Sequence, residues 1–178
     1  MPKGEYLGLY AIRMDDYPQS KRVSPDEMRL EFWAWNIQLE DDLVINPKYH
    51  QLELYGTRVF ETEVGYMIYT RPMSLGGILA SKESGRLDGI SPLLDDVEFQ
   101  VYANGELMKT NSTQMVDEFI GGNRGSLKAF ILQVDKFDDN SALPYIEFRI
   151  VGFGKKYGER GENLYFYKKK NYIESSKK

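Results

Sequence analysis

Cationic and aromatic side chains gather toward the end of the chain, and their types and spacing are the best suited to chemistry in this sequence. They are Arg149, Lys155, Lys156, Tyr157, Arg160, Tyr165, Tyr167, Lys168, Lys169 and Lys170. Cations can follow a phosphate backbone while aromatic rings stack on bases, so this mixture predicts a surface for single-stranded nucleic acid or for a protein partner. The alternative is that the same residues keep an exposed hairpin soluble and protect a strand edge.

The charges are divided unevenly along the chain. Residues 149–178 carry nine Lys and Arg against three Asp and Glu, whereas residues 1–148 carry 14 against 24. An acidic body repels phosphate outside the basic patch, which counts against nucleic acid as the partner. The same division lets the basic end of one copy lie against the acidic body of the next, which favours self-association.

The sequence lacks the residue patterns of the common catalytic and cofactor sites. His50 is its one histidine, it has no cysteine, and no G-x-S-x-G nucleophile motif occurs. A zinc site or a Ser-His-Asp triad needs more than this, so His50 is predicted to have a structural or surface role. The glycines of residues 152–158 do not have the spacing of a phosphate loop. We therefore predict no enzymatic activity, no cofactor and no metal.

Four Asp-Asp pairs fall in predicted turns, and carboxylates are ligands that calcium prefers. The pairs begin at Asp15, Asp41, Asp95 and Asp138. None lies in a loop with regularly spaced oxygen ligands, and Asp is a favoured turn residue because its side chain bonds nearby backbone N–H groups. A calcium site and a glycosidase-like pair of carboxylates are therefore alternatives, but the sequence points to no particular residues for either.

A long hairpin over residues 144–170 is expected to carry the cationic residues. In its first strand, the apolar side chains from Ile146 to Ile150 alternate with charged ones, which is the period of a strand with one buried face. A basic loop punctuated by glycines and a second aromatic run over residues 164–168 follow. This order predicts two paired strands with an extended or bulged connection.

Other apolar runs predict further strands. Glu5–Arg13 and Arg29–Leu39 are apolar on both faces, so each is expected to be a central or interface strand. Residues 51–71 are too long for one flat strand. A split or bulge near Gly56 or Glu63 is therefore predicted.

Turn and helix signals divide the middle of the chain. Asn104-Gly105 lies between alternating runs and predicts a two-residue type I′ hairpin, because both residues tolerate positive φ. The spacing of apolar residues predicts one helix over Thr113–Ile120. Residues 72–92 show no period and are predicted to form an irregular arm or contact loop, or a simple surface excursion.

Together these elements predict an all-β fold, a mostly antiparallel β-sandwich or barrel of about eight or nine strands with one short helix. With 178 residues, the chain is expected to form a single β-rich domain over residues 1–170, followed by a basic C-terminal tail over residues 171–178. No run approaches the roughly 18 apolar residues of a membrane span, and no signal-peptide pattern occurs. We therefore expect no membrane association and a cytoplasmic location.

The pattern as a whole favours a non-enzymatic assembly or interaction subunit. Strands that are apolar on both faces, a long loop and divided charge suit a protein that buries surface against copies of itself or other protein subunits. Subunits of this fold class occur in virus- or phage-type particles, as capsid or tail components, which is an analogy of fold. The alternatives are a nucleic-acid-binding module that uses the hairpin 149–170, and a sandwich that binds carbohydrate or another small ligand.

Overall fold

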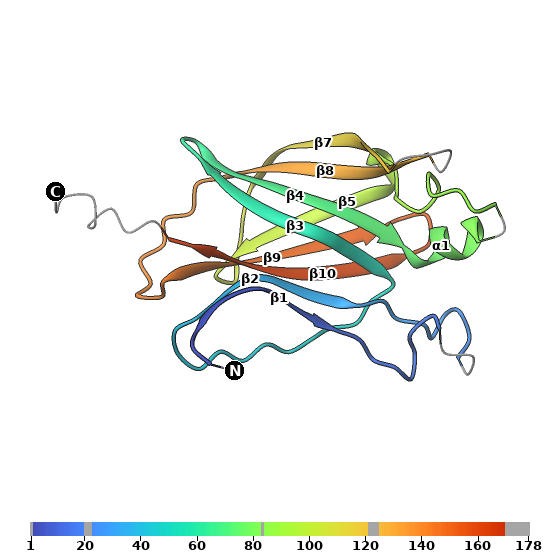
Figure 1. Ribbon diagram of the computed structural model, residues 1–178. Coiled ribbons are helices and arrows are strands. Elements are labelled where there is room, and N and C mark those ends of the chain that lie inside the picture. Colours follow the sequence, from blue (N-terminus) through green and yellow to red (C-terminus); the bar gives the residue numbers. More distant parts are fainter. Residues whose placement is uncertain (1, 20–22, 83, 121–124, 170–178) are drawn as a thin grey trace.

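The chain forms a two-layer β-sandwich. The computed structural model describes residues 2–19, 23–82, 84–120 and 125–169, so the predicted tail over residues 171–178 lies outside the described residues. The elements are β1 (Gly4–Ala11), β2 (Phe32–Leu39), β3 (Leu52–Thr62), β4 (Gly65–Ser74), α1 (Leu75–Ser81), the short 3₁₀-helix η1 (Leu94–Asp96), β5 (Val97–Ala103), β6 (Glu106–Leu107), β7 (Thr110–Phe119), β8 (Ser126–Asp135), β9 (Tyr145–Gly154) and β10 (Glu159–Lys168). Figure 1 shows the sheets face to face, with α1 at one end.

The six-stranded sheet has the order β1-β2-β10-β9-β5-β6, and the four-stranded sheet has the order β3-β4-β8-β7. Neighbouring strands are antiparallel except β2 and β10, which run parallel where Ala34 faces Leu164 and Trp35 faces Tyr165. The predicted all-β class is confirmed, as a sandwich and not as a closed barrel.

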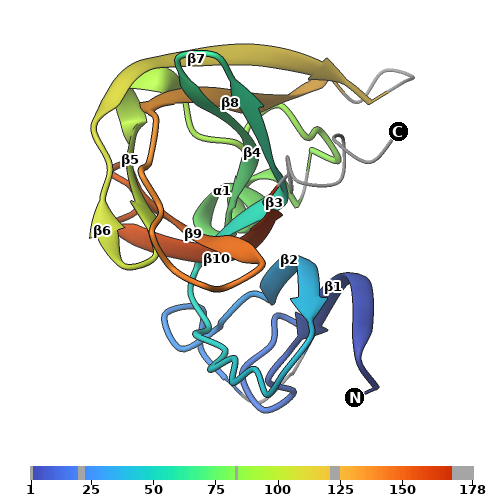
Figure 2. The ribbon, with the colours of Figure 1, turned by 90° about the vertical axis from the view of Figure 1, so that its left-hand side faces the viewer.

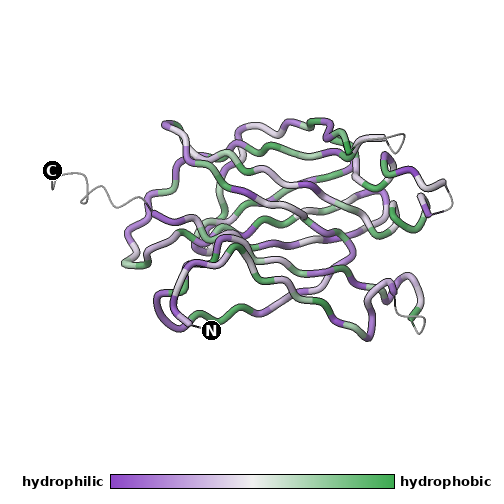
Figure 3. Tube along the Cα trace, in the orientation of Figure 1, coloured by the Kyte–Doolittle hydropathy of each residue, from purple (hydrophilic) through white to green (hydrophobic). Residues whose placement is uncertain are grey.

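The main core lies between the two sheets, because alternate residues of each strand point inward. Fully buried side chains include Phe148 and Ile150 on β9, Ile68 on β4 and Phe130 on β8. Figure 3 shows the same alternation as green and purple segments along the strands. Each such side chain contributes about 1.5–3 kcal/mol when it leaves water, so this layer holds the sheets together.

A second, smaller core lies on the outer face of the six-stranded sheet. Phe32, Ala34 and Ile37 of β2 and Phe166 of β10 are buried there. The segment between β2 and β3 covers part of them, and in Figure 1 it runs below β1 and β2. Its partly buried side chains in this core are Leu43, Ile45 and Tyr49. This irregular segment therefore takes the place of a third layer.

Several predicted elements are confirmed. β9 and β10 pair along their whole length as the long hairpin. Asn104 and Gly105 have φ angles of 45° and 87° and join β5 to β6, as the type I′ turn requires. Residues 51–71 divide between β3 and β4, whose register also shifts between Tyr55 and Arg58.

The helix predicted over Thr113–Ile120 is wrong. This segment belongs to β7, which pairs antiparallel with β8. The apolar spacing fits a helix, but pairing with the well-buried β8 overrides that local preference. The α-helix of the described chain is α1 instead, inside residues 72–92, which were predicted to be irregular. Ser74 caps it, because its Oγ accepts a hydrogen bond from the Gly77 N–H at 2.9 Å.

Glu5–Arg13 was expected to be a central or interface strand, and the central position is wrong, while the interface role stays a prediction. β1 is the edge strand of its sheet and pairs with β2 alone. Most of its residues are exposed, and the Leu7 side chain is 78% exposed. Tyr6 and Leu9 are partly buried against the second core, but the apolar surface of Leu7 is not covered by the described chain.

Candidate functional site

The predicted site residues divide into separate groups. Arg149 of β9 and Arg160 of β10 lie on the outer face of the six-stranded sheet, where both approach the carboxylate of Glu162. The Arg160 Nη2 donates to Glu162 Oε2 at 2.6 Å, and the Lys48 Nζ lies 3.3 Å from the other carboxylate oxygen. His50 bonds to Arg160 through its Nε2. The structure thus surrounds one buried carboxylate with cations.

The electrostatics of this cluster favour a charged Glu162 and a neutral His50. Burial alone would raise the Glu162 pKa, but the hydrogen bond from Arg160 and the charge of Lys48 hold that pKa below its ordinary value. Burial and the neighbouring Arg160 lower the pKa of His50. Arg149 also lies over the ring of Tyr102, 4.1 Å from its centroid. These cations are engaged within the fold.

The remaining predicted residues do not form one surface. Tyr165 is 9% exposed and belongs to the main core, and Tyr167 donates from its hydroxyl to Glu61 Oε2 at 2.9 Å. The pairs Lys155–Glu98, Lys168–Glu5 and Lys169–Asp139 link further cations to carboxylates, and Lys170 lies outside the described residues. Binding of nucleic acid by this hairpin stays a prediction. The described cations are dispersed and most are paired with carboxylates, so their arrangement adds no support to it.

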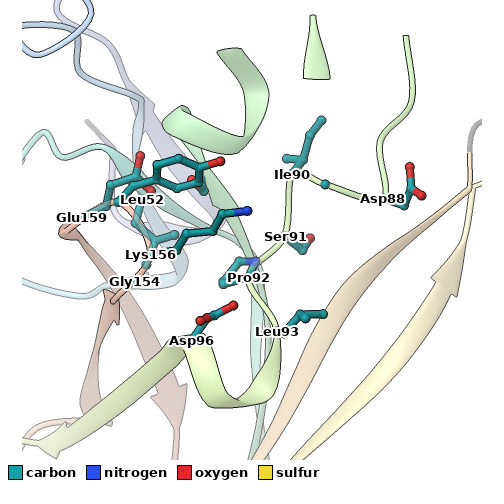
Figure 4. Close-up of a pocket in the computed structure, with 13 residues that line it drawn as sticks. Leu52, Asp88, Ile90, Ser91, Pro92, Leu93, Asp96, Gly154, Lys156 and Glu159 are labelled. Carbon is teal, nitrogen blue, oxygen red and sulfur yellow. The ribbon is translucent and has the colours of Figure 1, made fainter. Parts of the chain in front are cut away.

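Lys156 and Tyr157 line a cavity at the end of the sandwich where the β9–β10 turn meets residues 88–96. The cavity measures about 170 Å³. Figure 4 shows the Lys156 amine extending into the space between Glu159 on one side and Ile90 on the other. The residues that line the cavity are Leu52, Ser74, Asp88, Gly89, Ile90, Ser91, Pro92, Leu93, Asp96, Gly154, Lys156, Tyr157 and Glu159.

Helix α1 packs against two of the residues that line this cavity, Tyr157 and Glu159. Glu159 is 5% exposed and accepts a hydrogen bond from the Gly76 N–H at 2.7 Å, and its burial raises its pKa. The Tyr157 ring lies directly against Gly76, where a Cβ would come within 2.5 Å of the ring. A glycine is therefore needed for α1 to approach the turn this closely.

Aromatic side chains form a second cluster, on β1, β2 and β3. Trp33 stacks on Trp35 with ring centroids 4.6 Å apart and an interplanar angle of 3°, and Tyr55 meets both rings at their edges. Tyr10 of the exposed β1 packs on Trp33 at 4.7 Å. Glu53 is 4% exposed and accepts a hydrogen bond from the Trp33 Nε1 at 2.9 Å.

Sequence reasoning found part of the end cavity. The basic turn and residues 72–92 were both singled out, but as separate features. Ser91 and Glu159 lie inside these two segments but were not named as site residues, because nothing in their local sequence indicates that they line one cavity. Their proximity arises from the pairing of β9 with β10 and from the return of residues 88–96 over the turn.

The described residues hold no group of three or more His, Cys, Asp or Glu side chains placed to bind a metal. None of the helices in the described ranges has the length and apolar character that a membrane crossing requires. Comparisons with protein families, characterised proteins and solved structures find no match to this chain.

Proposed function

We propose that the protein is a non-enzymatic interaction subunit that associates with copies of itself through the outer edge of β1. One observation carries this proposal. β1 is an eight-residue edge strand that pairs with β2 on one side and with no other strand of the described chain on the other. Such an edge presents unpaired backbone N–H and C=O groups, which are a template for another strand.

The other sheet edges are less suited to this role. β6 has two residues. β3 is held against β10, where the side chain of Asn163 donates to the Leu54 carbonyl oxygen. β7 carries Asp117 and Glu118 and a register shift near its start. Charges and irregular pairing are features that protect an edge from strand addition.

β1 has little of this protection. It contains neither Pro nor Lys, and its one charged residue, Glu5, is paired with Lys168. Leu7 and Tyr10 are 78% and 49% exposed, and Figure 2 shows β1 as the outermost strand of its sheet. Pairing β1 with β1 of a second copy would satisfy both edges and bury both sets of apolar side chains around one two-fold axis.

The proposal extends to assembly into a larger particle of the virus or phage type, with the six-stranded sheets of neighbouring copies joined at β1. It also places this assembly in a cytoplasm, because a chain without cysteine needs no oxidising compartment to fold. The open edge of β1 supports one contact of such an assembly. A two-fold contact at β1 makes a dimer, and a particle would need a second contact surface.

The test is the oligomeric state in solution, measured by sedimentation velocity across the micromolar range. The wild-type protein should associate as its concentration rises. Leu7→Lys places a charge on the exposed side of β1, so this variant should remain monomeric at concentrations where the wild type does not.

Val44→Lys is the matched control, because Val44 is 80% exposed but lies in the segment between β2 and β3. It removes a similar apolar side chain and should associate like the wild type. A wild-type protein that stays monomeric over the whole range contradicts the proposal. Equal weakening by both substitutions contradicts the assignment to β1.

A further inference from the structure

We propose that the cavity at the end of the sandwich binds a small organic carboxylate, with the carboxylate on Lys156 and Ser91 and the apolar body against the cavity wall. The cavity of about 170 Å³ is close to the ~150 Å³ of an apolar cavity that accommodates benzene. A ligand of roughly that size, such as a six-membered ring bearing one carboxylate, therefore matches the available space. This inference does not depend on association through β1.

The charges around the cavity leave one cation unmatched. Asp88 accepts hydrogen bonds from Arg86 at 2.9 and 3.0 Å. Asp96 is attracted only at longer range by Lys155, whose ion pair is with Glu98. Glu159, the third carboxylate, is bonded to a backbone N–H of α1. Lys156 forms no ion pair with any described residue, and its nearest recorded partner is the Tyr157 ring, 5.2 Å from the amine.

Ser91 supplies a donor with no partner. Ser91 is 5% exposed, and its Oγ has no hydrogen-bond partner in the described part of the chain. A buried hydroxyl without a partner costs about 1–3 kcal/mol, which makes it a strong candidate to bond to a ligand. Because Ser91 and Lys156 both line the cavity, they can share the two oxygens of one carboxylate.

Apolar side chains line the rest of the cavity. Leu52 at 2% exposure and Ile90 at 8% form its buried part, while Leu93 is 52% exposed and lies nearer to solvent. A ligand body placed there would be largely removed from water, and each buried methylene group adds about 0.8 kcal/mol. A fully polar anion such as phosphate would leave this wall unused, so we assign the site to carboxylates with an apolar body.

Calorimetric titration of the full-length protein with three compounds of similar shape tests the assignment. Benzoate has the required charge, benzamide is neutral and the benzylammonium ion has the opposite charge. Benzoate should bind most tightly. Lys156→Met should weaken benzoate binding by about tenfold or more, and Ser91→Ala should weaken it by a smaller factor.

Lys155→Met is the matched control, because Lys155 is adjacent but pairs with Glu98 and does not line the cavity. It should bind benzoate like the wild type, and thermal melting should show that all three variants fold. The assignment is overturned if benzoate does not bind at millimolar concentration, or if benzamide or benzylammonium binds as tightly. Unchanged binding in Lys156→Met would overturn it as well.

Discussion

The buried carboxylate of Glu53 has a pKa far from its ordinary value, which makes the stability of the fold depend on pH. Burial is the main cause that raises its pKa to about 8, and the nearby Glu31 adds to the effect. The hydrogen bond from Trp33 and the charge of Arg71 oppose the rise without cancelling it. The folded protein therefore holds a proton on Glu53 at pH values where the unfolded chain has lost it.

The sign of the pH dependence follows from this raised pKa. The contribution of Glu53 to stability is fully present below its ordinary pKa of 4.5 and is lost as the pH rises toward about 8. We expect the free energy of unfolding to fall across this window, by at most about 1.4 kcal/mol per pH unit from this group. Glu53→Gln should remove that part of the slope, as measured by urea unfolding at several pH values.

Glu98→Gln provides the matched control, because it removes a carboxylate at an exposed position of β5. Its stability should follow the wild-type pH dependence. A Glu53→Gln variant that retains the full wild-type slope would show that Glu53 titrates normally in the folded protein. The intrinsic tryptophan fluorescence should change over the same pH window, because Trp33, one of the two tryptophans, donates to this carboxylate.

At the scale of single elements, local patterns predicted strands better than helices. The β9–β10 hairpin and the Asn104-Gly105 turn are specified by nearby residues, through alternation and through two residues that accept positive φ. β7 is different, because its apolar spacing also fits a helix and only the partner strand β8 decides between them. α1 contains Gly76 and Gly77, which are poor helix formers, so its sequence does not indicate a helix.

β10 lies very close to β3 at Gly161. A Cβ on Gly161 of β10 would overlap the carbonyl oxygen of Leu52 on β3. Gly161→Ala should therefore push the two strands apart and lower the free energy of unfolding by about 1–3 kcal/mol. Chemical denaturation monitored by circular dichroism measures this loss.

Gly154→Ala gives a comparison on the neighbouring strand. A Cβ at Gly154 would lie 3.9 Å from its closest neighbours, in ordinary van der Waals contact. This variant should lose much less stability than Gly161→Ala. Similar losses in both variants would mean that the general cost of replacing a glycine in a strand outweighs the specific contact with β3.

For the whole molecule, the fold class could be predicted and the strand order could not. The class follows from alternation, which is a local property of each segment. Strand order depends on pairs such as β2 with β10, whose partners are far apart in the sequence. The end cavity also depends on contacts between segments far apart in the sequence, since Leu52, Ser91 and Lys156 come from three distant segments. Its residues become a site only when both sheets have assembled.

The pairing between β2 and β10 is the shortest connection inside the six-stranded sheet, apart from that of the two-residue strand β6. β1 and β2 connect to the rest of their sheet through the short parallel register of β2 with β10, supported by the second core. We expect this pair of strands to open before the rest of the sandwich unfolds. In native-state hydrogen exchange, amides of β2 should therefore exchange with a lower opening free energy than amides of β9. Equal protection of β2 and β9 would contradict this expectation.

The position of β10 also has a consequence during translation. β1 and β2 leave the ribosome before the other described strands, but β10, the second strand with which β2 pairs, is the last of the described strands to be synthesised. Until then Trp33, Trp35 and Phe32 lack much of the packing that buries them in the finished protein. The nascent chain therefore exposes these apolar side chains of β2 until β10 has been made, and a chaperone that shields them should raise the yield of folded protein.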